Sequence, residues 1–134
     1  MISLFENLGN KVITIEKKDK VKYHAAAAVC SNLVVGLINM SENLLKECGF
    51  DEKSAHEAIT PIVMGNIKHI INDGTVNALT GPIQRNDIGT VKKHLECLND
   101  DEKRTYKAVS LEVLKVAGNR DKNIDYSEME EILK

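Results

Sequence analysis

Apolar residues recur at helical spacing along most of the chain, and the longest periodic segment runs from about Lys20 to Cys48. Its Ala25–Ala28 run strongly favours helix, and Gly49 stands where a C′ glycine would end one. The apolar positions at helical spacing are Tyr23, Ala27, Val34, Leu37, Ile38, Leu44 and Leu45. We expect one long amphipathic helix.

The next segment contains both a helix start and a possible interruption. Asp51 and Ser54 are alternative N-caps, and Ser54 with Glu57 matches a capping box. Pro61 predicts a turn ending near Thr60 or a kink. The apolar positions after it are Ile62, Val63, Ile67, Ile70 and Ile71, and they predict an amphipathic helix that stops at Asp73-Gly74.

Three more helices are predicted after a break at Thr80-Gly81-Pro82. Each begins at a residue whose side chain can accept from a free backbone N–H. The predicted limits are a start at Asp87 or Thr90, a cap within Asn99–Asp101 with an end at Gly118, and a cap at Asp125 or Ser127 with an end at Leu133.

The start of the chain differs from the rest. Val12-Ile13-Thr14-Ile15 is too β-branched for a comfortable helix and predicts a strand, after the helix-like Ile2–Leu8. One strand cannot form a sheet alone, so this segment indicates the tail of an α/β unit whose remainder is absent. The fold class is therefore predicted as all-α: a helical bundle with a short N-terminal remnant of an α/β domain.

Composition excludes several classes of protein. The 134 residues fit one compact domain, and 18 Lys+Arg against 20 Asp+Glu give a net charge of −2, which argues against nucleic-acid binding. No apolar run approaches the ~20 residues of a membrane span, so we expect no membrane association. Cys30, Cys48 and Cys97 are odd in number and widely spaced, and we expect reduced, mostly buried thiols in a cytoplasmic protein.

Three kinds of binding site are disfavoured by motif: dinucleotide, calcium and zinc sites. The chain lacks a glycine-rich phosphate loop, so by itself it should bind no dinucleotide. Asp121, Asn123 and Asp125 have the spacing of the first EF-hand ligands, but Tyr126 and Ile132 replace the turn glycine and the bidentate glutamate. A capping and turn role is favoured over calcium binding. No two histidines stand at i, i+4, so no helical zinc site is expected.

Candidate chemistry lies on the long helix. His24 and Asn32 are about 80° apart around a regular helix axis, and Lys20 lies about 40° beyond His24, so the three could line one broad wall. Lysine and histidine could relay a proton, and asparagine could orient a substrate. The alternative is a capping lysine, a half-buried histidine and an asparagine bonded to a loop.

The second candidate region is the segment from Thr80 to Asp87. It combines a free Gly81, a rigid Pro82 and the lone Arg85, and could present N–H groups and a guanidinium to an anion. The alternative is a helix connector in which Asp87 caps the next helix and Arg85 forms a structural ion pair. His94, one turn after Thr90, is more often a surface or partner-helix contact than a ligand.

Together these blocks resemble a family of Rossmann-like NAD(P)-dependent oxidoreductases whose second half is a helical domain of unassigned function. The match covers nearly the whole chain, from roughly Phe5 to Ala117. The blocks that carry it are Asp19-Lys20-Val21-Lys22-Tyr23-His24-Ala25-Ala26-Ala27, Ser31-Asn32, Ala78-Leu79-Thr80-Gly81-Pro82-Ile83, Arg85, Asp87, Thr90-Val91, His94-Leu95 and Leu98. The helical domain is similar to the C-terminal domains of 6-phosphogluconate and 3-hydroxyisobutyrate dehydrogenases and of deazaflavin-dependent NADP reductases.

The resemblance implies that residues 1–18 are the remnant of a missing dinucleotide-binding domain and that 19–134 form a substrate and dimerisation domain. NAD(P) would bind the missing domain, and this chain alone would bind no cofactor. The implied catalytic residues are Lys20 or Lys22, His24 and Asn32, and the implied substrate-binding residues are Tyr23, Thr80, Gly81, Pro82, Arg85, Asp87 and His94. Asn86 replaces the family's usual glycine, and asparagine tolerates the left-handed backbone that such a turn requires.

These observations favour the substrate-binding and dimerising domain of an NAD(P)-dependent oxidoreductase, acting as a homodimer on a small anionic substrate and inactive alone. A second hypothesis is a non-enzymatic helical homodimer that serves as an interaction or scaffold module. A third, a small metal-binding helical protein, depends only on Asp121–Asp125 and the histidines. The DNA upstream of the first codon would discriminate the first two, because an enzyme requires a strand, glycine loop and helix there.

Overall fold

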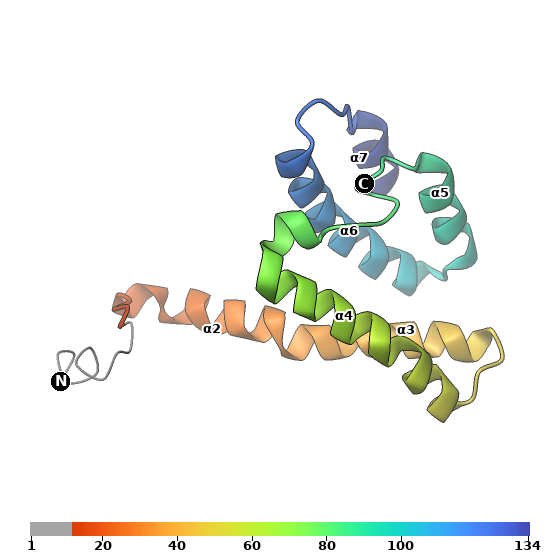
Figure 1. Cartoon of the computed structure of the whole chain (residues 1–134), viewed down its shortest axis with the longest axis horizontal. Helices are drawn as coiled ribbons and strands as arrows, with labels where there is room; N and C mark the ends of the chain where they lie inside the picture. Colours follow the sequence, from red (N-terminus) through yellow and green to blue (C-terminus); the bar gives the residue numbers. More distant parts are fainter. Residues whose placement is uncertain (1–11) are drawn as a thin grey trace. The chain divides into compact units, whose positions relative to one another are not determined.

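The computed structural model describes residues 12–134, and every regular element in that range is helical (Figure 1). The elements in order are η1 (Lys17–Asp19), α2 (Lys20–Cys30), α3 (Asn32–Glu47), α4 (Glu52–Ala78), α5 (Ile88–Cys97), α6 (Asp100–Arg120) and α7 (Ser127–Leu133). The all-α prediction is confirmed. The chain divides between Leu44 and Leu45 into two compact units, and each is described separately below.

The first unit contains two successive helices where the sequence predicted one. The backbone leaves the helical region at Ser31, with φ −124° and ψ −77°, although α3 continues in nearly the same direction as α2 (Figure 1). The Ser31 hydroxyl donates to the carbonyl of Ala27 at 2.6 Å. A side-chain hydroxyl that bonds the preceding turn competes with the helix ladder, which explains the interruption.

The apolar side chains of α2 and α3 are uncovered in the part of the chain that the structure describes. No residue of either helix is buried, and Val21, Leu33 and Val35 are at least 60% exposed. The stretch Lys17–Glu47 is long and apolar enough to cross a membrane by length and composition, unlike any other helix of residues 12–134. The expectation that no apolar run approaches this length was wrong, because residues 23–41 contain no Asp, Glu, Lys or Arg.

The predicted strand does not form. Val12–Ile15 belongs to no strand, and no strand elsewhere in the described residues could pair with it. β-Branched residues favour extended backbone, but a strand needs a hydrogen-bonded neighbour. The helix-like Ile2–Leu8 lies outside the described residues, so the α/β remnant assigned to 1–18 stays a prediction.

The second unit is built around one apolar core. α6 packs against α4 and α7, and α5 packs against α7. The core cluster consists of Ile83, Val91, Leu114, Met129 and Leu133. Met129 and Leu133 are 0% and 1% exposed, so the last helix closes the core although it has only seven residues.

Most predicted helix limits are confirmed. Asp51 caps α4, Asp87 caps α5, and Asn99 caps α6 in a capping box with Glu102. α3 ends as expected just before Gly49, which has φ +95° and donates its N–H to the carbonyl of Lys46. The end predicted at Gly118 was wrong, since α6 continues to Arg120.

The sequence predicted that a helix stops at Asp73-Gly74. The backbone of α4 leaves the helical region there, because Gly74 has φ +78° and ψ 165°. α4 runs through Pro61 with helical backbone, so the turn predicted near Thr60 was wrong. Proline removes one ladder hydrogen bond, and Pro61 is exposed, where water can satisfy the freed carbonyl.

The three cysteines are free and exposed, not buried as expected. Cys30 lies on the uncovered α2, and Cys48 follows the last turn of α3. Cys97 ends α5, where its thiol donates to the carbonyl of His94 at 3.1 Å. The three cysteines are exposed because they lie at helix ends or on a helix without buried residues, where no core surrounds them.

Candidate functional site

The segment from Thr80 to Asp87 forms a compact turn between α4 and α5. Gly81 has φ +105° and Asn86 has φ +53°, so both occupy the left-handed region. The N–H of Arg85 donates to Gly81 at 3.1 Å, and that of Asp87 donates to Pro82 at 2.8 Å. The left-handed conformation expected of Asn86 is confirmed, and it reverses the chain just before α5.

Side chains near the end of α6 hold the first half of the turn. Arg120 Nη1 donates to the carbonyl of Leu79 at 2.6 Å, and Gln84 Nε2 donates to Asp121 Oδ2 at 3.0 Å. Ile83, 7% exposed, inserts into the core from the middle of the turn. The turn is thus fixed at its entry and at its centre.

The segment before α7 holds the second half. The Tyr126 hydroxyl donates to the carbonyl of Gln84 at 2.7 Å, and Asn86 Nδ2 donates to that of Asp125 at 3.0 Å. The Asn86 Oδ1 atom is buried and accepts no hydrogen bond from residues 12–134. These anchors, which the sequence did not reveal, come from residues some 40 positions away.

Arg85 is the exposed cation on this fixed turn. Its guanidinium makes no hydrogen bond or ion pair with any residue that the structure describes, so the structural ion pair weighed above does not form there. Asp87 instead accepts from the Thr90 N–H at 3.0 Å and from the Thr90 hydroxyl at 2.8 Å. These bonds, with the nearby positive charge of Arg85, lower the pKa of Asp87. The capping alternative for Asp87 is therefore correct.

His94 lies one turn beyond Thr90 on α5 and contacts a neighbouring helix. Its Nδ1 is 2.9 Å from the hydroxyl of Tyr106 on α6, and the two rings meet edge to face at 83°. The contact agrees with the expectation of a partner-helix role. The sequence analysis did not single out Tyr106 as a candidate site residue.

The residues predicted on the long helix lie in the first unit, and all are exposed: Lys20, Lys22, Tyr23, His24 and Asn32. The Asn32 amide is 2.8 Å from the Ser31 hydroxyl at the helix interruption. The predicted angle of about 80° between His24 and Asn32 applies only to an unbroken helix, and the helix is interrupted at Ser31. The first-unit residues and the Thr80–His94 residues belong to different units, so a cleft between them stays a prediction.

The acidic residues before α7 have structural roles. Asp125 accepts from the Ser127 N–H at 3.0 Å, and Asp121 accepts from Gln84. The N-cap residue of α7 is Tyr126, so the cap predicted at Asp125 or Ser127 was wrong, while the turn role predicted for this segment agrees with the bond of Asp125 to Ser127. Among residues 12–134 no group of three or more His, Cys, Asp or Glu side chains is placed to hold a metal ion.

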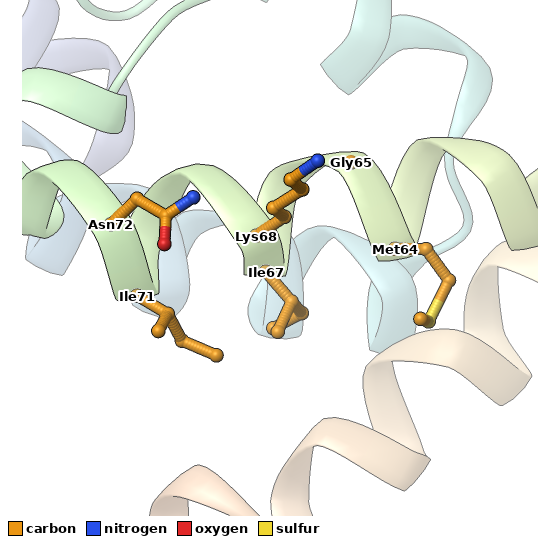
Figure 2. Close-up of a pocket in the computed structure, with 6 residues that line it drawn as sticks. All are labelled: Met64, Gly65, Ile67, Lys68, Ile71 and Asn72. Atoms are coloured by element: carbon orange, nitrogen blue, oxygen red, sulfur yellow. The ribbon is translucent and has the colours of Figure 1, made fainter.

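A shallow hollow of about 420 Å³ lies along α4, and every residue that lines it belongs to that helix. Figure 2 shows Met64, Ile67 and Ile71 projecting to the same side of the helix. Ile71 and Met64 are 76% and 65% exposed. A surface on one helix without converging polar groups is typical of a packing face and not of a small-molecule site.

Fold and site together define an all-helical domain with a tightly anchored, cation-bearing turn and an uncovered apolar helix pair. The chain belongs to the family described as a domain of unknown function, DUF2520, whose match covers residues 1–113. No curated protein and no solved structure matches the chain.

Proposed function

We propose that this chain is the C-terminal substrate-binding and dimerising domain of an NAD(P)-dependent oxidoreductase, inactive without a dinucleotide-binding domain. Membership of a family of unknown function is compatible with this assignment, and the resemblance described above motivates it. In this proposal the chain corresponds to the helical C-terminal domain of 6-phosphogluconate dehydrogenase and its relatives.

The observation that carries the proposal is the uncovered apolar surface of α2 and α3. Leaving such a surface in water is unfavourable, and apolar patches of this kind mark interaction sites. We assign it to a second copy of the chain and to the dinucleotide-binding domain. The charge-free stretch 23–41 includes His24, Ser31, Asn32 and Asn39, whose polar groups are better satisfied at a protein interface than in lipid. We therefore place the protein in the cytoplasm.

The dimer can be tested with a matched pair of substitutions. Val35, 67% exposed on α3, and Val109, 39% exposed on α6, are both helical valines. In sedimentation velocity we expect a wild-type dimer, a monomer for Val35→Glu and a dimer for Val109→Glu. A wild-type monomer at all concentrations, or a Val35→Glu dimer of unchanged affinity, refutes the dimer. Cosedimentation with anionic phospholipid vesicles would refute the cytoplasmic assignment.

Substrate binding is assigned to the turn that bears Arg85. A guanidinium recognises a carboxylate by two parallel hydrogen bonds, and this one is exposed on a fixed backbone. The exposed Thr80 begins the same segment and adds a hydroxyl, while Gly81, Pro82 and Asp87 shape the turn. The resemblance also assigns His94, further along α5, to substrate binding. In the intact enzyme, Tyr23, His24 and Asn32 would complete the cleft, and His24 or Lys20 would handle the proton that accompanies hydride transfer.

NMR titration of the full chain with millimolar 3-hydroxybutyrate and pyruvate tests this assignment. We expect shifts at the Arg85 side chain and the 81–87 backbone, reduced several-fold in Arg85→Lys. Arg104→Lys, at an exposed arginine paired with Asp101, is the matched control and should leave the shifts unchanged. Equal shifts in both variants, or none in the wild type, contradict the site. Micromolar NADPH binding to the isolated chain would contradict the need for a separate cofactor domain.

The alternative is a non-enzymatic homodimer that serves as an interaction or scaffold module. The same uncovered helices favour it, because they provide a large isologous surface without requiring any chemistry. Under this alternative the dimer forms, but no small carboxylate perturbs the Arg85 turn.

A further inference from the structure

Two side chains from α5 and α6 form a hydrogen-bonded pair in the second unit. His94 Nδ1 lies 2.9 Å from the Tyr106 hydroxyl. Tyr106 is half-buried, whereas His94 is exposed. The pair therefore runs from the partly buried side of α6 to the surface and ends at an imidazole ring.

The geometry of the ring pair fixes the orientation of His94. The ring centroids are 5.8 Å apart and the planes meet at 83°, an edge-to-face arrangement that favours one rotamer. Cys97 Sγ donates to the backbone carbonyl of His94, not to its ring. Within residues 12–134, Tyr106 is thus the hydrogen-bond partner of the ring at Nδ1, and no described group bonds Nε2.

The direction of this hydrogen bond follows from the chemistry of the phenol. Burial, the largest effect, raises the pKa of Tyr106, so the phenol keeps its proton at neutral pH. A protonated phenol has one proton to donate, and an unprotonated imidazole nitrogen is an acceptor. The 2.9 Å contact is therefore satisfied when the Tyr106 hydroxyl donates to His94 Nδ1.

We propose that Tyr106 is a positioning residue that donates its hydroxyl proton to His94 Nδ1 and so holds the neutral imidazole in the Nε2–H tautomer. His94 then presents a single N–H donor at the surface, nearly two turns from the Asp87-capped start of α5. Such a donor matches an oxygen acceptor of a carbonyl or carboxylate group. This consequence for the ligand rests on the proposed function, whereas the tautomer does not.

Long-range ¹H–¹⁵N correlation of the imidazole rings in the full chain tests the proposal without any ligand. At a pH of about 8, where an ordinary imidazole is neutral, we expect His94 Nδ1 to resonate as an unprotonated nitrogen and Nε2 as a protonated one. His94→Gln identifies the signals by their loss. In Tyr106→Phe, which removes only the hydroxyl, both nitrogens should move towards the average of the two tautomers.

Tyr126→Phe is the matched control, because the Tyr126 hydroxyl donates to Gln84 and not to a histidine. It should leave the His94 signals unchanged. A protonated Nδ1 in the wild type overturns the proposal even if Tyr106→Phe fails to fold, and identical signals in Tyr106→Phe and wild type overturn it as well. If the tautomer is as expected but pyruvate and 3-hydroxybutyrate shift nothing near Arg85, only the proposed function fails.

Discussion

Truncating Met129 tests how the core of the second unit is completed. This side chain is fully buried on α7, a helix that lies beyond the last residue of the family match. Met129→Ala removes the outer part of the side chain and leaves a cavity against Leu114 and Leu133. The surrounding helices can relax only partly, so both the lost apolar burial and the cavity destabilise the fold.

The expected loss is about 3 kcal/mol of unfolding free energy, within the roughly 2–5 kcal/mol of buried Met→Ala or Leu→Ala substitutions. For a urea dependence of about 1.5 kcal/mol per molar, the midpoint would fall by about 2 M. Met64→Ala is the matched control, because Met64 is also helical but 65% exposed. Its helix propensity changes by the same amount, so the comparison isolates burial.

Urea unfolding followed by circular dichroism at 222 nm measures both variants. The reasoning fails if Met129→Ala costs less than about 1 kcal/mol, the scale of an ordinary surface change. It also fails if the Met64→Ala loss at low protein concentration equals that of Met129→Ala. Either result would mean that α7 does not close the core as described.

Further predictions concern backbone conformation and protonation. Gly65→Ala should raise the unfolding free energy by about 0.5–1 kcal/mol, because Gly65 lies within α4 with open space around it, whereas Gly74→Ala should lower it, because φ is +78° there. Asn86→Ala should be less stable than Asn86→Gly by about 1 kcal/mol, since only glycine enters the left-handed region freely; equal urea midpoints would contradict this. Hydrogen bonds from Ser54 and Thr90 hold the pKa values of Asp51 and Asp87 below their values in the unfolded chain. The urea midpoint should therefore fall as the pH drops below about 4, because this stabilisation is lost when the folded carboxylates protonate. In an Asp87→Asn variant the urea midpoint should decline less steeply with falling pH.

Local signals in the sequence predicted the helices well. Asp87 and Asn99 cap helices because their side chains accept from free N–H groups of the first turn, a bond that needs no distant residue. Gly74 was recognised for a similar reason, since only glycine adopts its backbone conformation readily. Such features depend on a few consecutive residues and can be derived without knowledge of packing.

The errors arose where the outcome depends on the surroundings. Pro61 was expected to interrupt a helix, but exposure to water makes the lost hydrogen bond tolerable. Val12–Ile15 was expected to form a strand, but pairing requires a second segment. Cys30 was expected inside, but it is exposed, and the helix that carries it has no buried residue.

The candidate site shows the same division. Arg85 and the left-handed Asn86 were identified from the motif, because unusual turn chemistry is visible in sequence. Arg120 and Tyr126, which hold that turn, were not, since their bonds to Leu79 and Gln84 join segments some 40 residues apart. Tyr106 was missed because its contact with His94 joins two helices and leaves no local signal in the sequence.

The family match stops at residue 113, inside α6, while the buried side chains of the second unit continue to Leu133. An expression fragment trimmed to the matched residues would cut α6 in its last third and remove Leu114, Met129 and Leu133 together. The remaining helices would expose their inner surface and aggregate. For biochemical work the minimal folding piece therefore extends through the final helix, well past the homology boundary.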